Sequence, residues 1–117
     1  ITNLPSGLTV YINSGQNTTI GDITNLPSGL TYYSNSGQNI VSDYSGGNLN
    51  SGITYFLSIP ISGGLSSSEV DDLFIELDST LPGLGYVNIT GTNAAPTAAS
   101  LAARNNMVAN GVTLIHN

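Results

Sequence analysis

The chain has 117 residues, enough for one domain, and only 7% of them are charged, against ~25% in an average soluble protein. Its formal net charge of -6 excludes nucleic acid and anionic membranes as partners, because both require a cationic surface. No apolar run approaches the roughly 20 residues that a membrane-spanning helix needs, so membrane insertion is also excluded.

The chain opens with two near-identical units of 22 residues. ITNLPSGLTVYINSGQNTTIGD is followed at once by ITNLPSGLTYYSNSGQNIVSDY. Within the first 17 positions they differ only where Val10 becomes Tyr32 and Ile12 becomes Ser34. A fixed period of this length predicts a solenoid, in which each repeat packs on its neighbours.

The same spacing continues downstream and predicts five strands. Each predicted strand segment begins with an apolar residue at position i, has a second apolar residue at i+3, and has a third residue facing the same side at i+5, which we call the third ladder position. The segments start at residues 8, 30, 53, 84 and 112, so the separations are 22, 23, 31 and 28 residues. Thr, Val, Tyr and Ile dominate these segments, which favours strands stacked in parallel. The third position holds Asn13, Asn35, Ser58, Ile89 and Asn117. Because an inward polar side chain must be hydrogen-bonded, either these residues pair from strand to strand or the register of the early units is off by one.

This pattern resembles the leucine-rich repeat, L-x-x-L-x-L followed by an asparagine. The LPSGL segment before each early strand is similar to the short bacterial type, whose repeats carry LP there, and the resemblance covers essentially the whole chain. The polar third ladder position departs from the family pattern. The resemblance implies a short solenoid in which Asn17, Asn39 and Asn93 bind backbone groups of the turns.

Two helices are predicted where the strand separations are longest. Ser66 and Glu69 form a capping box, and an apolar face follows at Val70, Leu73, Phe74 and Leu77. The alanine-rich segment PTAASLAARNNMVANG predicts a second helix, with Pro96 in its first turn and a stop at Asn110-Gly111. We therefore expect an α/β fold in one domain (1–117), with helix-free repeats over 1–65. Helix-containing repeats over 66–117 place both helices on the convex side and form a C-terminal cap.

No constellation of residues predicts catalysis. The chain has no cysteine and no lysine, and His116 is its one histidine, so neither a nucleophile with a base nor a metal site is indicated. The acids Glu69, Asp71, Asp72, Glu76 and Asp78 are interpreted as a solvated helix face. We expect no enzyme activity, no cofactor and no metal.

Alternation along the strands predicts the exposed face of the sheet. Its two outward columns are Val10, Tyr32, Tyr55, Tyr86 and Leu114, and Ile12, Ser34, Leu57, Asn88 and His116. Exposed apolar and aromatic side chains of this extent are typical of an interface with a protein or a glycan. The candidate binding residues are Val10, Ile12, Tyr32, Tyr55, Leu57 and Tyr86.

The two ends of the predicted solenoid form a second candidate interface. With no capping helix at the N-terminal end, a second copy could pair its last strand with the first strand, head to tail. The residues concerned are Leu8, Thr9 and Tyr11 at one end and Val112, Leu114 and Ile115 at the other. We expect a structural module that self-associates into an extended assembly or filament at an extracellular, cell or virion surface. The alternative is a monomeric, adhesin-like domain that recognises a protein or glycan on its tyrosines.

Overall fold

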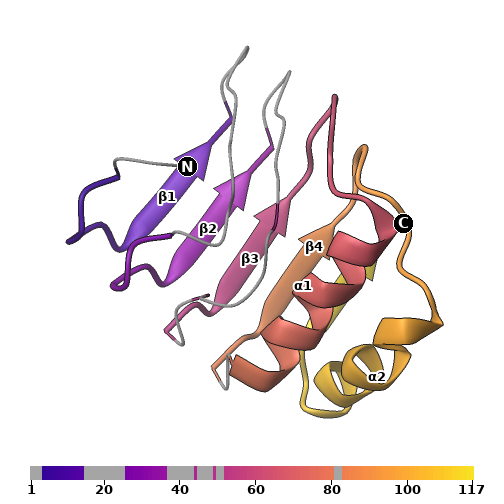
Figure 1. Ribbon diagram of the computed structural model, residues 1–117. Coiled ribbons are helices and arrows are strands. Elements are labelled where there is room, and N and C mark those ends of the chain that lie inside the picture. Colours follow the sequence, from indigo (N-terminus) through magenta and orange to yellow (C-terminus); the bar gives the residue numbers. More distant parts are fainter. Residues whose placement is uncertain (1–3, 15–25, 37–43, 45–48, 50–51, 81–82) are drawn as a thin grey trace.

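The computed structural model has an α/β fold with five parallel strands in one sheet, in the order β1-β2-β3-β4-β5 (Figure 1). It describes residues 4–14, 26–36, 44, 49, 52–80 and 83–117. The strands are β1 (Val10–Asn13), β2 (Tyr32–Asn35), β3 (Tyr55–Ser58), β4 (Tyr86–Ile89) and β5 (Thr113–His116). The helices are α1 (Ser67–Thr80), the short 3-10 helix η2 (Ala98–Ser100) and α2 (Leu101–Ala109).

The helices lie on one side of the sheet, near β4 and β5, and the core lies between them and the strands (Figure 1). The inward column of Tyr33, Phe56 and Val87 is fully buried. The predicted apolar face of α1 is confirmed, because its four side chains have no solvent exposure: Val70, Leu73, Phe74 and Leu77.

The start of α1 is also confirmed. The Ser66 amide donates to Glu69 Oε1 at 3.0 Å, and the Glu69 amide donates to Ser66 Oγ at 3.3 Å. This reciprocal pair is the predicted capping box, which satisfies two amides that the helix itself leaves unpaired.

The second helical segment starts differently from the prediction and ends as predicted. Thr97 Oγ1 accepts from the Ala99 amide at 3.1 Å and caps η2, so Pro96 precedes the helix and does not lie in its first turn. At the other end, Gly111 adopts φ 88° and its amide donates to the Val108 carbonyl, while the Val112 amide donates to Met107. These two bonds form a Schellman motif, which requires a residue with positive φ after the helix.

This turn corrects the predicted register of the last strand. The predicted spacing places Leu114 opposite Tyr86 and Ile115 opposite Val87, but the residues opposite them are Thr113 and Leu114, each one residue earlier in the chain. The reason is that Val112 belongs to the turn and is buried beside Met107. Leu114 and His116 therefore occupy the inward columns, and Ile115, 39% exposed, faces outward.

Asn93 holds the segment after β4 against the segment after β3. Its Oδ1 accepts from the Leu65 amide at 2.8 Å, and its Nδ2 donates to the carbonyls of Ser58 and Thr90 at 3.0 Å each. This confirms the predicted backbone-binding role at Asn93. Asn17 and Asn39, predicted to do the same, lie outside the described residues.

Candidate functional site

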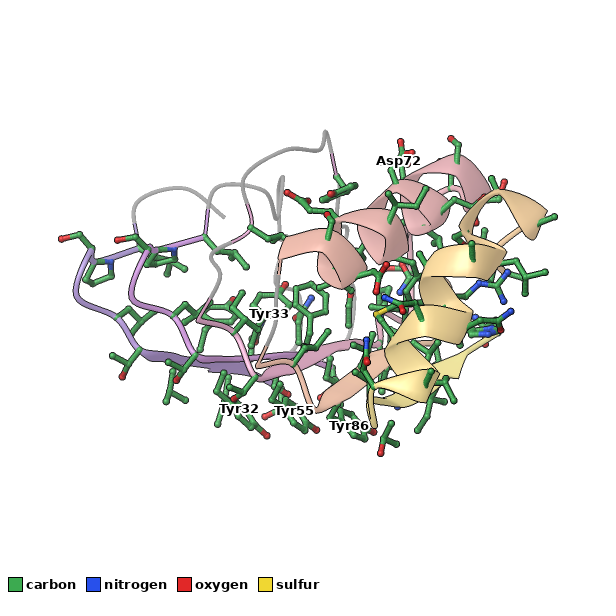
Figure 2. All side chains as sticks on the ribbon, turned by 90° about the horizontal axis from the view of Figure 1, so that it is seen from below. Tyr32, Tyr33, Tyr55, Asp72 and Tyr86 are labelled. Carbon is green, nitrogen blue, oxygen red and sulfur yellow. The ribbon has the colours of Figure 1, made fainter. Side chains whose placement is uncertain are left out.

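The exposed face of the sheet carries three stacked tyrosines, Tyr32, Tyr55 and Tyr86, which we call the tyrosine ladder. They occupy the same register position on β2, β3 and β4 and project away from the helices, whereas Tyr33 points toward the helix side (Figure 2). The ring centroids of Tyr32 and Tyr55 are 4.2 Å apart, those of Tyr55 and Tyr86 are 4.6 Å apart, and each pair is parallel within 6°. The predicted outward placement of these residues is confirmed.

The stacking determines what the ladder presents to solvent. Each ring covers a face of its neighbour, so the rings expose mainly their edges and hydroxyls. The Tyr86 hydroxyl accepts from Asn88 Nδ2 at 3.2 Å. The neighbouring register positions at the two ends of the ladder are Val10 and Thr113, so the aromatic column stops before both edges of the sheet.

The central ring, Tyr55, has a tyrosine ring stacked on each of its two faces. Burial between its neighbours, together with the adjacent Tyr32 and Tyr86, raises the pKa of Tyr55 to about 12. The Tyr55 phenol is therefore neutral at physiological pH, so charge repulsion does not oppose the stack.

The second outward column is apolar at both edges of the sheet. It runs through Ile12, Ser34, Leu57, Asn88 and Ile115. Ile12 is 65% exposed and Ile115 39% exposed, whereas Leu57 is half-buried. The exposed apolar area on this column is thus concentrated at β1 and β5, together with Val10, which is 48% exposed.

The β1 edge leaves part of the core uncovered. Leu8 and Tyr11 are half-buried, whereas the equivalent Leu30 and Tyr33 have no exposure. The Tyr11 ring stacks on Tyr33 at 5.5 Å and 12°. Burial still raises the pKa of Tyr11. Thr9 is exposed, and its carbonyl accepts from the Thr31 amide at 2.8 Å.

The third inward column is polar, as predicted. Asn13 Nδ2 donates to Asn35 Oδ1 at 3.3 Å, so pairing from strand to strand occurs between β1 and β2. Asn35 and Ser58 are fully buried, which shows that the register of the early units is correct. Asn35 Nδ2 and Ser58 Oγ find no hydrogen-bond partner within the described residues. Leaving such a buried atom unpaired costs about 1–3 kcal/mol.

The β5 edge is supported by the helical segment. Leu114 packs against the core, and the His116 ring makes an edge contact with Phe74 at 5.9 Å. Val112, predicted to be an assembly residue, is buried, and its side chain is not available at the surface. Ile115 is the outward apolar side chain of this strand.

The acids of α1 are not all solvated, which corrects the interpretation from sequence. Asp71 is 4% exposed and accepts from the Thr97 amide at 2.9 Å, from Thr97 Oγ1 at 2.5 Å and from Ser100 Oγ at 2.5 Å. Burial raises the pKa of Asp71, but these hydrogen bonds and the charge of Arg104 outweigh it and bring the pKa below its ordinary value. Asp71 therefore attaches η2 to α1.

Glu69 and Glu76 bind backbone and side-chain donors of the segment before β3. Tyr44 donates its amide to Glu69 Oε2 at 3.1 Å and its hydroxyl to Glu76 Oε2. Glu76 Oε1 accepts from the Leu49 amide at 3.1 Å. Sequence reasoning missed both anchors. A signal for them was present in the sequence: Glu69 and Glu76 are seven residues apart and therefore lie on the same face of α1.

Among the described residues, no group of three or more His, Cys, Asp and Glu side chains is placed to share one metal ion. No helix within the described ranges has the length and apolar character needed to cross a bilayer.

Comparisons with protein-family models, with curated proteins and with solved structures found no match to this chain.

Proposed function

We propose that this protein is a non-catalytic structural module, a short leucine-rich-repeat-like solenoid that associates end to end with further copies of itself. The observation that carries the proposal is the difference between equivalent residues at the edge and inside the sheet. Leu30 and Tyr33 are fully buried, with a strand on each side, whereas the equivalent Leu8, just before β1, and Tyr11, on β1, are half-buried. A strand added to the β1 edge would cover them as β1 covers β2.

The β5 edge of a second copy has matching chemistry. Continuing the observed register would place Tyr11 beside Leu114 of the second copy, and Ile12 beside its Ile115. The first pair is inward and apolar, and the second joins the two exposed isoleucines. Asn13 and His116 would meet in the polar column, where each can donate and accept a hydrogen bond.

Charge does not oppose this contact. Neither β1 nor β5 contains an acid, and the acids of the helical region lie on α1. In the view along the sheet, Asp72 points away from the strands on the far side of α1 (Figure 2). The net charge of -6 therefore keeps assemblies soluble without placing carboxylates at the two edges.

A contact between two different edges is heterologous and leaves one free edge at each end of the assembly. Unless the rotation between copies closes a ring, such contacts build an open filament. An extended, charge-poor assembly suits a cell or virion surface.

The test is particle size against concentration, measured by light scattering and negative-stain imaging. We expect wild-type protein to grow into elongated particles. Ile12→Lys would put a cation at the β1 edge and keep the protein monomeric. Ile75→Lys is the matched control, because Ile75 is also exposed, at 44%, and belongs to α1 and to neither edge strand. It should assemble like the wild type.

A wild-type protein that stays a 12.0 kDa monomer at all concentrations would exclude this proposal. The second candidate, a monomeric recognition domain, would then lead, because the tyrosine ladder lies on the face that the helices leave open (Figure 2). The covered ring faces favour a protein over a glycan as its ligand, since sugars bind aromatic residues through the ring face. In that case Tyr55→Ala would weaken ligand binding without changing the particle mass.

A further inference from the structure

We infer that the tyrosine ladder is a site of oxidative cross-linking, at which Tyr55 forms a carbon–carbon bond to a neighbouring tyrosine of the same chain. The inference rests on the geometry of the three rings and is independent of the proposed assembly. A one-electron oxidant, such as a peroxidase with hydrogen peroxide, is the co-reactant.

The geometry brings the reacting atoms together. Coupling of two tyrosines joins carbons ortho to the hydroxyls, where the phenoxyl radical carries much of its spin. The ring centroids of Tyr32 and Tyr55 are 4.2 Å apart and the rings are parallel within 6°, which puts the ortho carbons of the two rings within reach of one another when the rings tilt. The centroids of Tyr55 and Tyr86 are only slightly farther apart, at 4.6 Å. All three side chains are half-buried at the surface, so their edges meet the oxidant and the rings retain freedom to tilt as the bond forms.

The step balances without further reagents. Each of two phenols loses one electron and one proton, the two radicals join at their ortho carbons, and the hydrogens on those carbons move to the oxygens. The product has two fewer hydrogen atoms than the reactants. The two electrons and two protons reduce one hydrogen peroxide to two water molecules.

The composition directs oxidation to these rings. The chain contains no cysteine and no tryptophan, and its one methionine, Met107, is 2% exposed. Of the other tyrosines, Tyr33 is fully buried and Tyr44 is 5% exposed. Tyr11 stacks on Tyr33 at the longer distance of 5.5 Å, and its partner is inaccessible. The ladder is therefore the one close tyrosine stack of the described residues in which every ring reaches the surface.

The bond would lie within one chain. Because Val10 and Thr113 flank the ladder in register, no further ring of the same column reaches either edge of the sheet. A link from Tyr32 to Tyr55 joins β2 covalently to β3 and closes the chain between them, which restricts the unfolded chain as a disulfide does.

The experiment treats dilute, full-length folded protein with a peroxidase and hydrogen peroxide. We expect a monomer lighter by two hydrogens, with the blue fluorescence of dityrosine. Peptide mapping should show Tyr32 joined to Tyr55, with a lesser product joining Tyr55 to Tyr86. The denaturant midpoint of the cross-linked monomer should be higher than that of untreated protein.

Two variants and one condition distinguish the ladder from random coupling. Tyr55→Phe keeps the stack but removes the shared phenol and should lose the intramolecular product, whereas Tyr86→Phe should retain it. Circular dichroism verifies that both variants fold. Wild-type protein unfolded in urea should lose the preference for Tyr55. Equal cross-linking in Tyr55→Phe, links that map to Tyr11 or Tyr44, or links formed only between chains would each overturn the inference.

Discussion

The first two repeat units are almost the same in sequence and differ sharply in environment. Their inward residues are identical, with Leu, Tyr and Asn at the same three positions of each unit. In the second unit these residues are fully buried, and in the first they are half-buried. Identical side chains therefore contribute differently, because burial depends on which strand lies alongside and not on the residue itself.

The two positions at which the first 17 residues of the units differ face the other side of the sheet. Val10 faces outward in register with Tyr32, and Ile12 with Ser34. The inward pattern is thus the same in both units, and the outward pattern changes. At the edge it exposes aliphatic side chains, and one strand further in it starts the tyrosine ladder.

Removing the equivalent tyrosines should give the largest contrast between the two strands. We expect Tyr33→Ala to lower the free energy of unfolding by about 3–5 kcal/mol, because it empties a filled site in the core. Tyr11→Ala should cost clearly less, since part of its ring is already in water. Urea denaturation of the two variants measures the difference.

Tyr33→Phe is the matched control. It keeps the ring and removes only the buried hydroxyl, so the loss of stability should be far smaller than that of Tyr33→Ala. Phe56 occupies the equivalent site on β3. Equal losses for Tyr33→Ala and Tyr11→Ala would mean that β1 is as well covered in solution as β2.

Near the opposite end of the molecule a buried carboxylate, Asp71, attaches η2 to α1, and the stability that it supplies should depend on pH. We expect Asp71→Asn to lower the free energy of unfolding at pH 7 by about 1–3 kcal/mol, because the charged acceptor of the Thr97 and Ser100 hydrogen bonds is lost. The pKa of Asp71 is lowered in the folded state, so its contribution is complete above the ordinary value of 3.8 and is lost as pH falls through the folded pKa.

Denaturation at several pH values tests this linkage. The gap in stability between wild type and Asp71→Asn should narrow as the pH is taken below 3.8. Asp72→Asn, on the neighbouring exposed position, should leave the unfolding free energy within about 0.5 kcal/mol of wild type. A gap that is independent of pH would show that the Asp71 carboxylate does not supply the stabilisation.

The smallest effect should come from making the first unit more like the second. Val10→Tyr places a fourth ring beside Tyr32 and should raise the free energy of unfolding by about 0.5–1.5 kcal/mol through ring stacking. Thr113→Tyr is the corresponding change at the other flank, beside Tyr86. Thermal unfolding monitored by near-ultraviolet circular dichroism measures both, and no gain in either would mean that the ladder is held by the backbone and not by stacking.

Much of the fold was predictable because it follows from local periodicity. The alternation in the repeated units placed the first four strands, and the pattern from Ser66 to Leu77 placed α1 and its cap. The last strand was predicted one residue out of register. Its start depends on how the Schellman motif positions Val112 against Met107, a packing choice that spacing alone does not contain.

The sequence predicted which face of the sheet carries the candidate site, but it did not predict how the side chains of that site are arranged. Alternation placed Tyr32, Tyr55 and Tyr86 on the open face. The rings lie parallel and cover one another, and this arrangement depends on the registers of the β2–β3 and β3–β4 pairs and on the side-chain rotamers. The burial of Asp71 was missed because its partners, Thr97 and Ser100, are 26 and 29 residues away.

The order of the amino acids was enough to predict which side of each early strand faces the core and where α1 begins, because these follow from periods of two and 3.6 residues and from one cap. The register of β5, the ring geometry of the ladder and the attachment of η2 by Asp71 became apparent only in the folded molecule. Each of these depends on contacts between segments that are distant in the chain, and such contacts are set by packing and by the pairing of buried polar groups.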